Sequence, residues 1–166
     1  MVADGFAYLS LITDAYSRKI TGFYLSKTLE AKGTIEALKM AIKNCSDTKN
    51  LIHHSDRGVQ YCCADYVKLL QNKNIKISMT ENGDPLENAI AERVNGILKE
   101  ELIQAKYNSF EDAQKSVAKA IVIYNSLRPH SSCSMLTPNE AHKKEGELKK
   151  HWKNYYKKKE VVMAEP

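Results

Sequence analysis

Two carboxylates, Asp56 and Glu92, are the residues whose types and spacing best suit metal chemistry. Asp56 follows the short apolar run Leu51–His54, and 35 residues separate it from Glu92. Carboxylate oxygens are preferred ligands of Mg²⁺, a hard cation that usually keeps several waters. Two such ions about 4 Å apart can activate an attacking hydroxyl and stabilise the leaving oxygen in phosphoryl transfer. Phosphoryl chemistry is therefore expected if the fold brings both side chains to one cleft.

The surroundings of Asp56 support two interpretations. It comes after a predicted buried strand and before Gly58, which permits a tight turn. In α/β sheets, functional groups gather at the carboxyl ends of strands. Asp is also common before glycine simply because it stabilises turns, so a purely structural role is the alternative.

The helix predicted from Asn88 to Ile103 turns Glu92 away from the protein core. At about 100° per residue, one side of this helix is an apolar stripe that faces the core. The stripe comprises Ile90, Val94, Ile97 and Leu98. The opposite side carries Asn88, Glu92, Asn95 and Lys99. That polar side is either part of a site or an ordinary solvated helix face.

The elements that must position these residues alternate along the chain. Short runs rich in β-branched and aromatic residues predict strands, and apolar residues spaced by three and four predict helices. Strands are expected at 6–14, 19–26, 51–54 and 75–79, and helices at 30–44, 65–73, 88–103, 110–124 and 138–144. A hairpin followed by alternating helices and strands indicates an α/β fold, a mixed sheet with flanking helices.

Composition limits the classes of function. The 166 residues suit one domain, and no run approaches 18 apolar residues, so we expect a cytoplasmic protein with no membrane partner. The net charge of +5 is concentrated at 141–160, where eight lysines oppose three glutamates. This distribution favours nucleic-acid binding by the C-terminal segment. The four cysteines lack zinc-site spacing and are expected to be reduced thiols.

The chain resembles the catalytic core of the DDE transposase and retroviral-integrase superfamily, above all bacterial insertion-sequence transposases. Four segments carry the resemblance, which extends from Gly5 to about His142. They are YLSLITDAYSRKITGFYL, LIHHSDRGVQYCCADYVKLL, GDPLENAIAERVNGILKEEL and YNSLRPHSSCSMLTPNEA. The HSDRG segment combined with the 35-residue interval to Glu92 is specific, and so is YNSLRPH followed by TP.

This resemblance implies an RNase H-like fold that cleaves and joins DNA strands with Mg²⁺ or Mn²⁺, in a homo-oligomer assembled on DNA. Asp56 would be the second catalytic carboxylate and Glu92 the third, both binding metal. The resemblance also implies contacts to DNA or support of the metal site, from Lys99, Asn95, Asn88 and Arg57. Arg57 presents a fork of donors suited to phosphate, although a plain surface charge is the alternative.

The N-terminus departs from the family pattern. Family members have a central strand before the hairpin, and that strand carries the first catalytic Asp. We expect an integrase-type core at 1–144 that lacks this strand and is a poor catalyst alone, with a basic extension at 145–166. Asp4 and Asp14 are weak candidates to replace the missing carboxylate.

Two other functions remain open. The chain could be a non-catalytic, nucleic-acid-binding remnant, because Trp152, Tyr155 and Tyr156 interleave with lysines and could stack on bases. A solvated terminal helix would explain the same pattern. A ribonuclease H-type hydrolase would share the fold and the metal chemistry, although the HSDRG and YNSLRPH segments favour a transposase.

Overall fold

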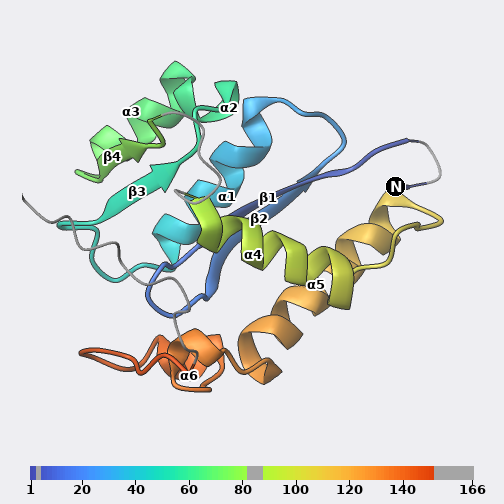
Figure 1. Ribbon diagram of the computed structural model, residues 1–166. Helices are drawn as coiled ribbons and strands as arrows, with labels where there is room; N and C mark the ends of the chain where they lie inside the picture. The colour runs from blue at the N-terminus through green and yellow to red at the C-terminus, as the bar shows by residue number, and fades with distance from the viewer. Residues whose placement is uncertain (3–4, 82–87, 152–166) are drawn as a thin grey trace, which may run out of the picture.

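The computed structural model describes residues 1–2, 5–81 and 88–151. Strand β1 (Tyr8–Thr13) and strand β2 (Ile20–Ser26) form the expected antiparallel hairpin, with Tyr8 opposite Ser26. The pairing is irregular between Ile12 and Thr13. Arg18 closes the turn with a positive φ of 66°. The prediction of a hairpin is confirmed (Figure 1).

Helix α1 (Ala31–Lys43) packs tightly against the hairpin, and a glycine makes this possible. A Cβ added to Gly22 on β2 would lie 2.1 Å from the carbonyl oxygen of Ala37 and 2.7 Å from the backbone nitrogen of Ala41. Both alanines are buried on the apolar side of α1. Small residues on both elements therefore set the distance between the helix and the hairpin.

Strand β3 (Ile52–Ser55) lies parallel to strand β4 (Lys76–Met79). The connection between them contains the short helix α2 (Val59–Cys62) and helix α3 (Ala64–Asn72). Helices α1 and α3 share a core with the residue that precedes β4, formed by the buried side chains of Leu38, Tyr66, Leu70 and Ile75. This unit holds the end of β3, and therefore Asp56, in place.

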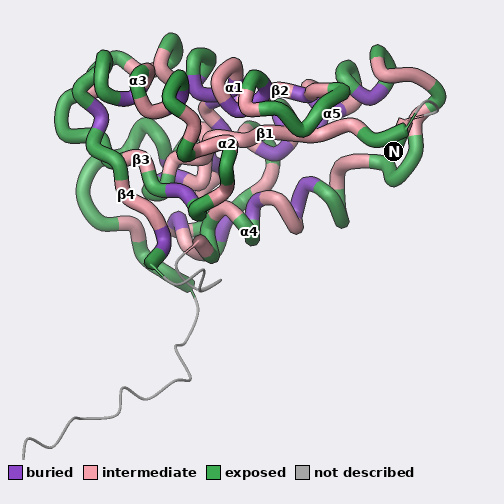
Figure 2. The backbone as a smooth tube through the Cα atoms, turned by 90° about the horizontal axis from the view of Figure 1, so that it is seen from above, coloured by how far each residue is buried: buried purple, intermediate pink, exposed green. Residues whose placement is uncertain are grey.

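Helix α4 (Ala89–Ile97) continues into the π-helical turn η2 (Leu98–Leu102), so the single helix predicted over 88–103 changes its hydrogen-bonding pattern. Helix α5 (Phe110–Leu127) follows, with Ser109 as N-cap as expected. Both helices pack on the face of the hairpin opposite α1 (Figures 1 and 2). The main core includes Ile20, Leu25, Val94, Ile97, Leu98, Val117, Ile121 and Tyr124.

The last described elements lie beside the start of β2. The 3₁₀ turn η3 (Ser131–Cys133) leads to helix α6 (Pro138–Ala141), which is shorter than the helix predicted over 138–144. Thr137 and Glu140 form a capping box, which satisfies two backbone donors of this short helix. His130 is buried edge-on against the ring of Tyr124.

The strands form two separate pairs. One sheet contains β1 and β2, the other contains β3 and β4, and among the described residues no ladder joins them. Alternate residues of the hairpin serve its two faces: Leu9 and Leu11 pack against the main core, whereas Ser10 and Ile12 face α1 and its core. The expected sheet is therefore present as two halves: α1 packs directly on the hairpin, and it contacts the unit of β3 and β4 through helices α2 and α3.

Candidate functional site

A cavity of about 1090 Å³ lies between the two sheets, and it contains most of the predicted site residues. Asp56, Asn88, Asn95 and Lys99 line it, whereas Glu92 and Arg57 are not among the lining residues. Asp56 comes from the end of β3, and the other three come from the polar side of α4 and from η2. The structure therefore places residues that are far apart in the sequence on one cavity.

The position of Asp56 is compatible with both roles considered from the sequence, stabilisation of a turn and a functional carboxylate at the end of a strand. Its Oδ1 accepts a hydrogen bond from the backbone N–H of Gly58 at 2.9 Å, as in an Asx turn. Its side chain is exposed directly after β3, and no described residue donates to Oδ2. One carboxylate oxygen stabilises the turn, which leaves the other for a cation.

Arg57 uses one of its donors inside the protein. Its Nε donates to the carbonyl oxygen of Thr80 at 2.7 Å, and this bond ties the turn after β3 to the end of β4. The backbone N–H of Thr80 donates back to the carbonyl oxygen of Ser55 at 3.1 Å. Together these two bonds fix the direction in which the chain leaves β3 at Asp56.

Glu92 lies in the first turn of α4 and is exposed, as its helical position predicts. A carboxylate at this position also interacts favourably with the helix dipole, which is a structural alternative. Lys99 is exposed as well, at the start of η2. Val94, Ile97 and Leu98 are buried as expected. Ile90 differs from the prediction because it lines the cavity and is 36% exposed.

A metal ion at this cavity would need ligands beyond the described side chains. Within them, no three His, Cys, Asp or Glu side chains gather closely enough to hold an ion. Mg²⁺ needs only one or two protein carboxylates when waters and substrate oxygens complete its shell. The exposed carboxylate of Asp56, with the amides of Asn88 and Asn95 on the same cavity, therefore fits the oxygen chemistry of such an ion.

Sequence reasoning missed the role of His53, a half-buried residue of β3. His53 lies against the rings of Tyr61 and Tyr66, and its Nε2 is 3.2 Å from the Tyr66 hydroxyl oxygen. Burial, with a smaller effect from His54, lowers the pKa of His53 to about 4. The ring is therefore neutral at pH 7 and packs β3 onto α3. The sequence offered one sign of this role, because two adjacent histidines stand in an apolar run that was predicted to be a buried strand.

Asp14 is engaged in a local network. Its Oδ2 accepts hydrogen bonds from the hydroxyl and the backbone N–H of Ser17, and lies 3.4 Å from Nδ1 of His142. Burial would raise the pKa of Asp14, but these bonds outweigh it and lower the pKa. Asp14 lines the same cavity as Asp56, but its carboxylate is held by these bonds. Asp14 therefore serves the turn after β1, and Asp4 lies outside the described residues.

The cysteines agree with the sequence-based expectation of reduced thiols. All four cysteines are free thiols. Within the described part of the chain, no helix combines the length and the apolar character needed to cross a membrane. The aromatic residues at 152–156, proposed to contact bases, lie outside the described residues.

Comparison with known proteins identifies the same family along most of the chain. Two models described as "Integrase core domain" match residues 1–85 and 73–138. Over 143 residues the chain is 34% identical to the "Putative transposase for insertion sequence element IS986/IS6110" of Mycobacterium tuberculosis. Over 139 residues it is 35% identical to transposase InsF for insertion sequence IS3A of Escherichia coli.

These matches cover 82% of this chain but only 51% and 48% of the two transposases. The chain therefore spans about half the length of the relatives that it matches.

Solved structures agree on the fold. One protein chain of a simian T-cell lymphotropic virus intasome, determined in complex with the PP2A regulatory subunit B56 gamma, superposes with a TM-score of 0.71 at 19% identity. This match covers 95% of this chain and 56% of the viral chain.

The HTLV-2 integrase catalytic core domain in complex with magnesium gives a TM-score of 0.59 at 21% identity, over 78% of this chain and 80% of that one. The fold is thus the RNase H-like fold of retroviral integrase cores, and the chain belongs to the integrase core domain family of insertion-sequence transposases and retroviral integrases.

Proposed function

We propose that this chain is the core of a transposase that cleaves and transfers DNA strands with Mg²⁺ or Mn²⁺. The observation that carries the proposal is the position of Asp56. It stands at the carboxyl end of β3, with one carboxylate oxygen free of described donors, on a cavity shared with Asn88, Asn95 and Lys99. The relatives named as transposases support the reaction class.

Asp56 and Glu92 are the residues proposed to hold the metal. The bound ion would supply Lewis acidity toward an attacking water or DNA 3′ hydroxyl and toward the leaving oxygen. Asn88 and Asn95 would support the ligands or the DNA. These assignments follow from the residue types, from the exposure of both carboxylates, and from the resemblance to the integrase core family.

Lys99 is proposed to hold the DNA backbone beside the metal. It is exposed and lines the same cavity as Asp56. Arg57 could add a phosphate contact through its terminal nitrogens, because only its Nε is bonded to Thr80. Each such contact neutralises a phosphate, so DNA affinity should fall as salt increases.

The two assigned carboxylates do not make a complete three-carboxylate site. We propose that the chain alone processes DNA weakly and that a third carboxylate completes the site in the active assembly. A homo-oligomer assembled on DNA is the proposed functional state. The basic segment 145–166 is proposed as an extension beyond the catalytic core of residues 1–144.

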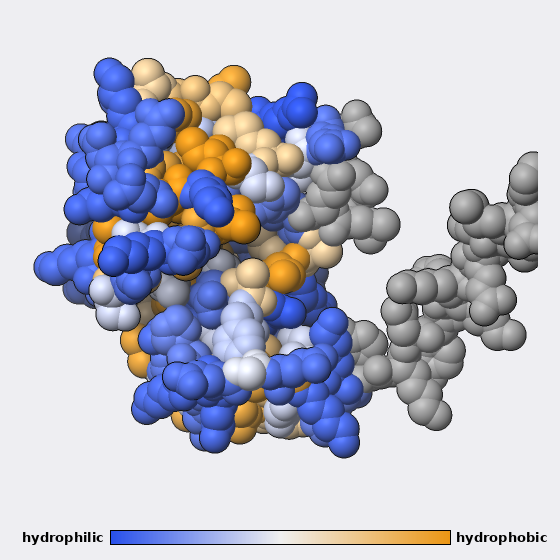
Figure 3. All heavy atoms as spheres, turned by 90° about the vertical axis from the view of Figure 1, so that its left-hand side faces the viewer, coloured by the Kyte–Doolittle hydropathy of each residue, from blue (hydrophilic) through white to orange (hydrophobic). Residues whose placement is uncertain are grey.

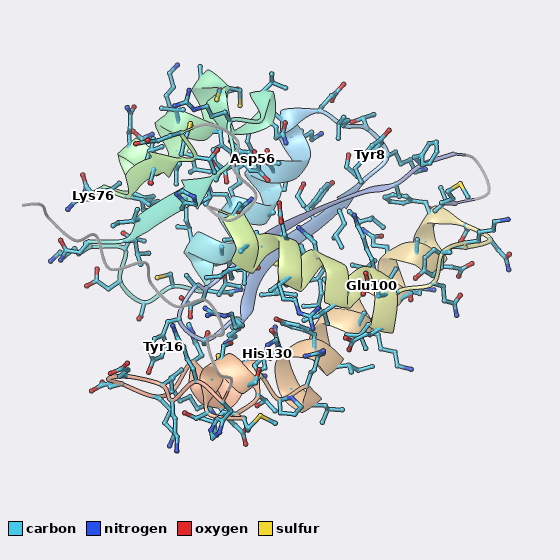
Figure 4. The ribbon with its side chains drawn as sticks, in the orientation of Figure 1. Tyr8, Tyr16, Asp56, Lys76, Glu100 and His130 are labelled. Carbon is cyan, nitrogen blue, oxygen red and sulfur yellow. The ribbon has the colours of Figure 1, made fainter. Side chains whose placement is uncertain are left out.

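Nicking of supercoiled plasmid DNA in Mn²⁺ tests the catalytic assignment. Glu92→Gln and Asp56→Asn should abolish the weak, metal-dependent nicking of the wild-type chain. Glu100→Gln is the matched control, because Glu100 is an exposed carboxylate on η2 that lies well away from Asp56 (Figure 4). Nicking that survived Glu92→Gln would overturn the assignment. Cleavage of an RNA–DNA hybrid in preference to DNA would instead favour a ribonuclease H-type hydrolase.

The second candidate is a non-catalytic nucleic-acid-binding remnant. The start of the basic extension is fixed to the protein, because the backbones of Lys149 and Ser134 are hydrogen-bonded at 2.9 Å and the N–H of His151 donates to the carbonyl of Ser131 at 2.8 Å. The extension therefore leaves from a defined place beside η3. Removal of residues 152–166 should reduce the dependence of DNA affinity on salt, and an unchanged slope would reject this role.

A further inference from the structure

The YNSLRPH segment takes no part in the proposed metal site, yet it carries a doubly hydrogen-bonded ion pair. Arg128 directly follows α5 and donates twice to Glu101 on η2, from Nε to Oε2 at 2.9 Å and from Nη2 to Oε1 at 2.7 Å. The two side chains are 24% and 45% exposed. The fork of an arginine binds a carboxylate and a phosphate in the same geometry. Glu101 therefore occupies a position that also suits a phosphate group.

His130 is a buried polar residue of the same segment. Its backbone N–H donates to the carbonyl of Leu136 at 3.0 Å. Its ring packs edge-on against Tyr124 at 5.2 Å, and the Tyr124 hydroxyl donates to the carbonyl of Arg18 at 3.1 Å. The residue is only 7% exposed, and its Nε2 has no hydrogen-bond partner among the described residues. Buried polar groups are normally hydrogen-bonded, so an unpaired imidazole nitrogen among charged neighbours points to a ligand.

Three arginines from different elements surround this histidine, and we call them the arginine cluster. Arg18 lies in the turn between β1 and β2, Arg93 lies on α4, and Arg128 follows α5. Burial and the charges of the arginine cluster lower the pKa of His130 to about 4, while Glu101 opposes them with a smaller effect. Neither Arg18 nor Arg93 has an ion-pair partner among the described residues. The strongest charges at this place are therefore three guanidiniums and one carboxylate, which leaves a positive balance.

We propose that the arginine cluster is a second anion site, separate from the cavity, and that it binds a phosphate group of a nucleic-acid strand. Glu101 holds Arg128 until the phosphate displaces it. Neither the arginine cluster nor His130 lines the cavity. Figure 4 shows His130 and Asp56 on opposite sides of α4. The two sites would therefore contact different parts of a bound strand, one at the metal and the other beyond α4.

The basic segment begins beside the arginine cluster, which favours a long polyanion over a single small anion. The N–H of His151 donates to the carbonyl of Ser131, the residue after His130, and the backbone of Lys149 is bonded to Ser134. Four lysines lie between positions 143 and 150. Figure 3 shows a mostly hydrophilic surface over α6 and the segment after it, in the lower part of the view. A nucleic-acid strand carries regularly spaced phosphates, so it can contact the cluster and these lysines together.

Removal of the competing carboxylate should strengthen DNA binding. Glu101→Gln leaves Arg128 to the phosphate, so the full chain should bind a fluorescein-labelled DNA duplex about threefold more tightly, as measured by fluorescence anisotropy in EDTA. Glu100→Gln is the matched control, because it removes the same charge from η2 without touching the pair of Glu101 and Arg128. No metal is present, so the result stands whether or not the chain cleaves DNA. Only the choice of DNA as the strand rests on the proposed function.

The alternative is that the ion pair only fastens α5 to η2. Glu101→Gln would then lower the urea midpoint of unfolding, and its DNA affinity would equal that of Glu100→Gln. Equal affinities of these two variants, or weaker binding by Glu101→Gln, would overturn the proposal.

A second pair of variants tests the arginine cluster itself. Arg93→Gln removes an exposed guanidinium from α4, and should weaken duplex binding about threefold and reduce the slope of log affinity against log salt by about 1. Lys68→Gln is the control, because Lys68 is an exposed cation on α3, across the molecule from His130 (Figures 1 and 4). Both positions are on the surface, so the urea midpoints should be unchanged. Equal affinities of the two variants would contradict the assigned site.

Nuclear magnetic resonance of the histidine ring nitrogens identifies the ligand. The signals of His130 should shift when the duplex is added, and a duplex with uncharged methylphosphonate linkages should leave them unchanged. A shift caused by inorganic phosphate at the same concentration of phosphate groups would make free phosphate the ligand, and a shift caused by polyglutamate would indicate an acidic protein. Either result would overturn the proposed source. Signals of His130 that do not respond to the duplex would overturn the site.

Discussion

Replacement of Gly22 by alanine should separate α1 from the hairpin and destabilise the whole site. The added methyl would lie 2.1 Å from the carbonyl oxygen of Ala37, 2.7 Å from the backbone nitrogen of Ala41 and 2.9 Å from its Cβ. Two of these atoms belong to the backbone of a helix, so no side-chain rotation relieves the contact. Overpacking typically costs about 1–3 kcal/mol, and we expect Gly22→Ala to reach about 3 kcal/mol.

Gly96→Ala is the matched control for this prediction. An added Cβ at Gly96 on α4 meets nothing within 4 Å. Alanine is more favourable than glycine in a helix by up to about 1 kcal/mol, so this change should be neutral or stabilising.

Urea unfolding monitored by circular dichroism measures both variants. For a protein of this size, about 3 kcal/mol corresponds to a Tm lower by roughly 6–12 °C. A Gly22→Ala variant within about 0.5 kcal/mol of the wild type would refute the reasoning from close backbone approach.

Three further changes follow from particular contacts. Ser109→Ala removes the bond from the Asp112 N–H to the N-cap hydroxyl at 3.0 Å and should cost about 1 kcal/mol in urea unfolding, whereas Ser109→Asp should retain most of the stability. Burial is the main cause that lowers the pKa of His53 and of His130 to about 4. In the unfolded chain both histidines bind a proton near pH 6.5, whereas in the folded protein they do so only near pH 4. The free energy of unfolding should therefore have its full value above pH 6.5 and decline toward pH 4. Replacement of both histidines by glutamine should flatten this decline, and an unchanged pH profile would contradict it. Arg57→Lys should keep the charge but lose the 2.7 Å bond to the Thr80 carbonyl, lowering stability by about 1 kcal/mol, and equal urea midpoints would show that this bond adds nothing.

Local patterns predicted the elements well. The hairpin, α1, α3 and α5 appear close to their expected positions because their apolar periodicity and caps are local properties. The N-cap role of Ser109 and the exposed position of Glu92 were predicted for the same reason.

Features that depend on distant parts of the chain were not predicted. Ile90 was expected in the core because helical periodicity identifies an apolar side without identifying what covers it, and here that side borders the cavity. The requirement for glycine at position 22 depends on α1, which lies many residues later. The π-helical turn at Leu98–Leu102 was not predicted, because the apolar periodicity of the sequence continues through it.

The candidate site was predicted in part. Asp56 was found because it combines a buried run with a glycine turn, and the structure places it on one cavity with Asn88, Asn95 and Lys99. The structural roles of His53 and Arg57 were missed, because they depend on contacts to Tyr66 and Thr80 that become neighbours only in the fold.

Binding of Mn²⁺ to the wild-type chain and to Asp56→Asn, followed by electron paramagnetic resonance, tests the central claim most directly. Asparagine keeps the oxygen that accepts from the Gly58 N–H, so the turn should survive while the negative charge is lost. Asp65→Asn, in the exposed first turn of α3, is the control. The account predicts that Asp56→Asn weakens Mn²⁺ binding at least tenfold and that the control does not. Equal binding by the wild type and Asp56→Asn would contradict the assignment of Asp56 as a metal ligand.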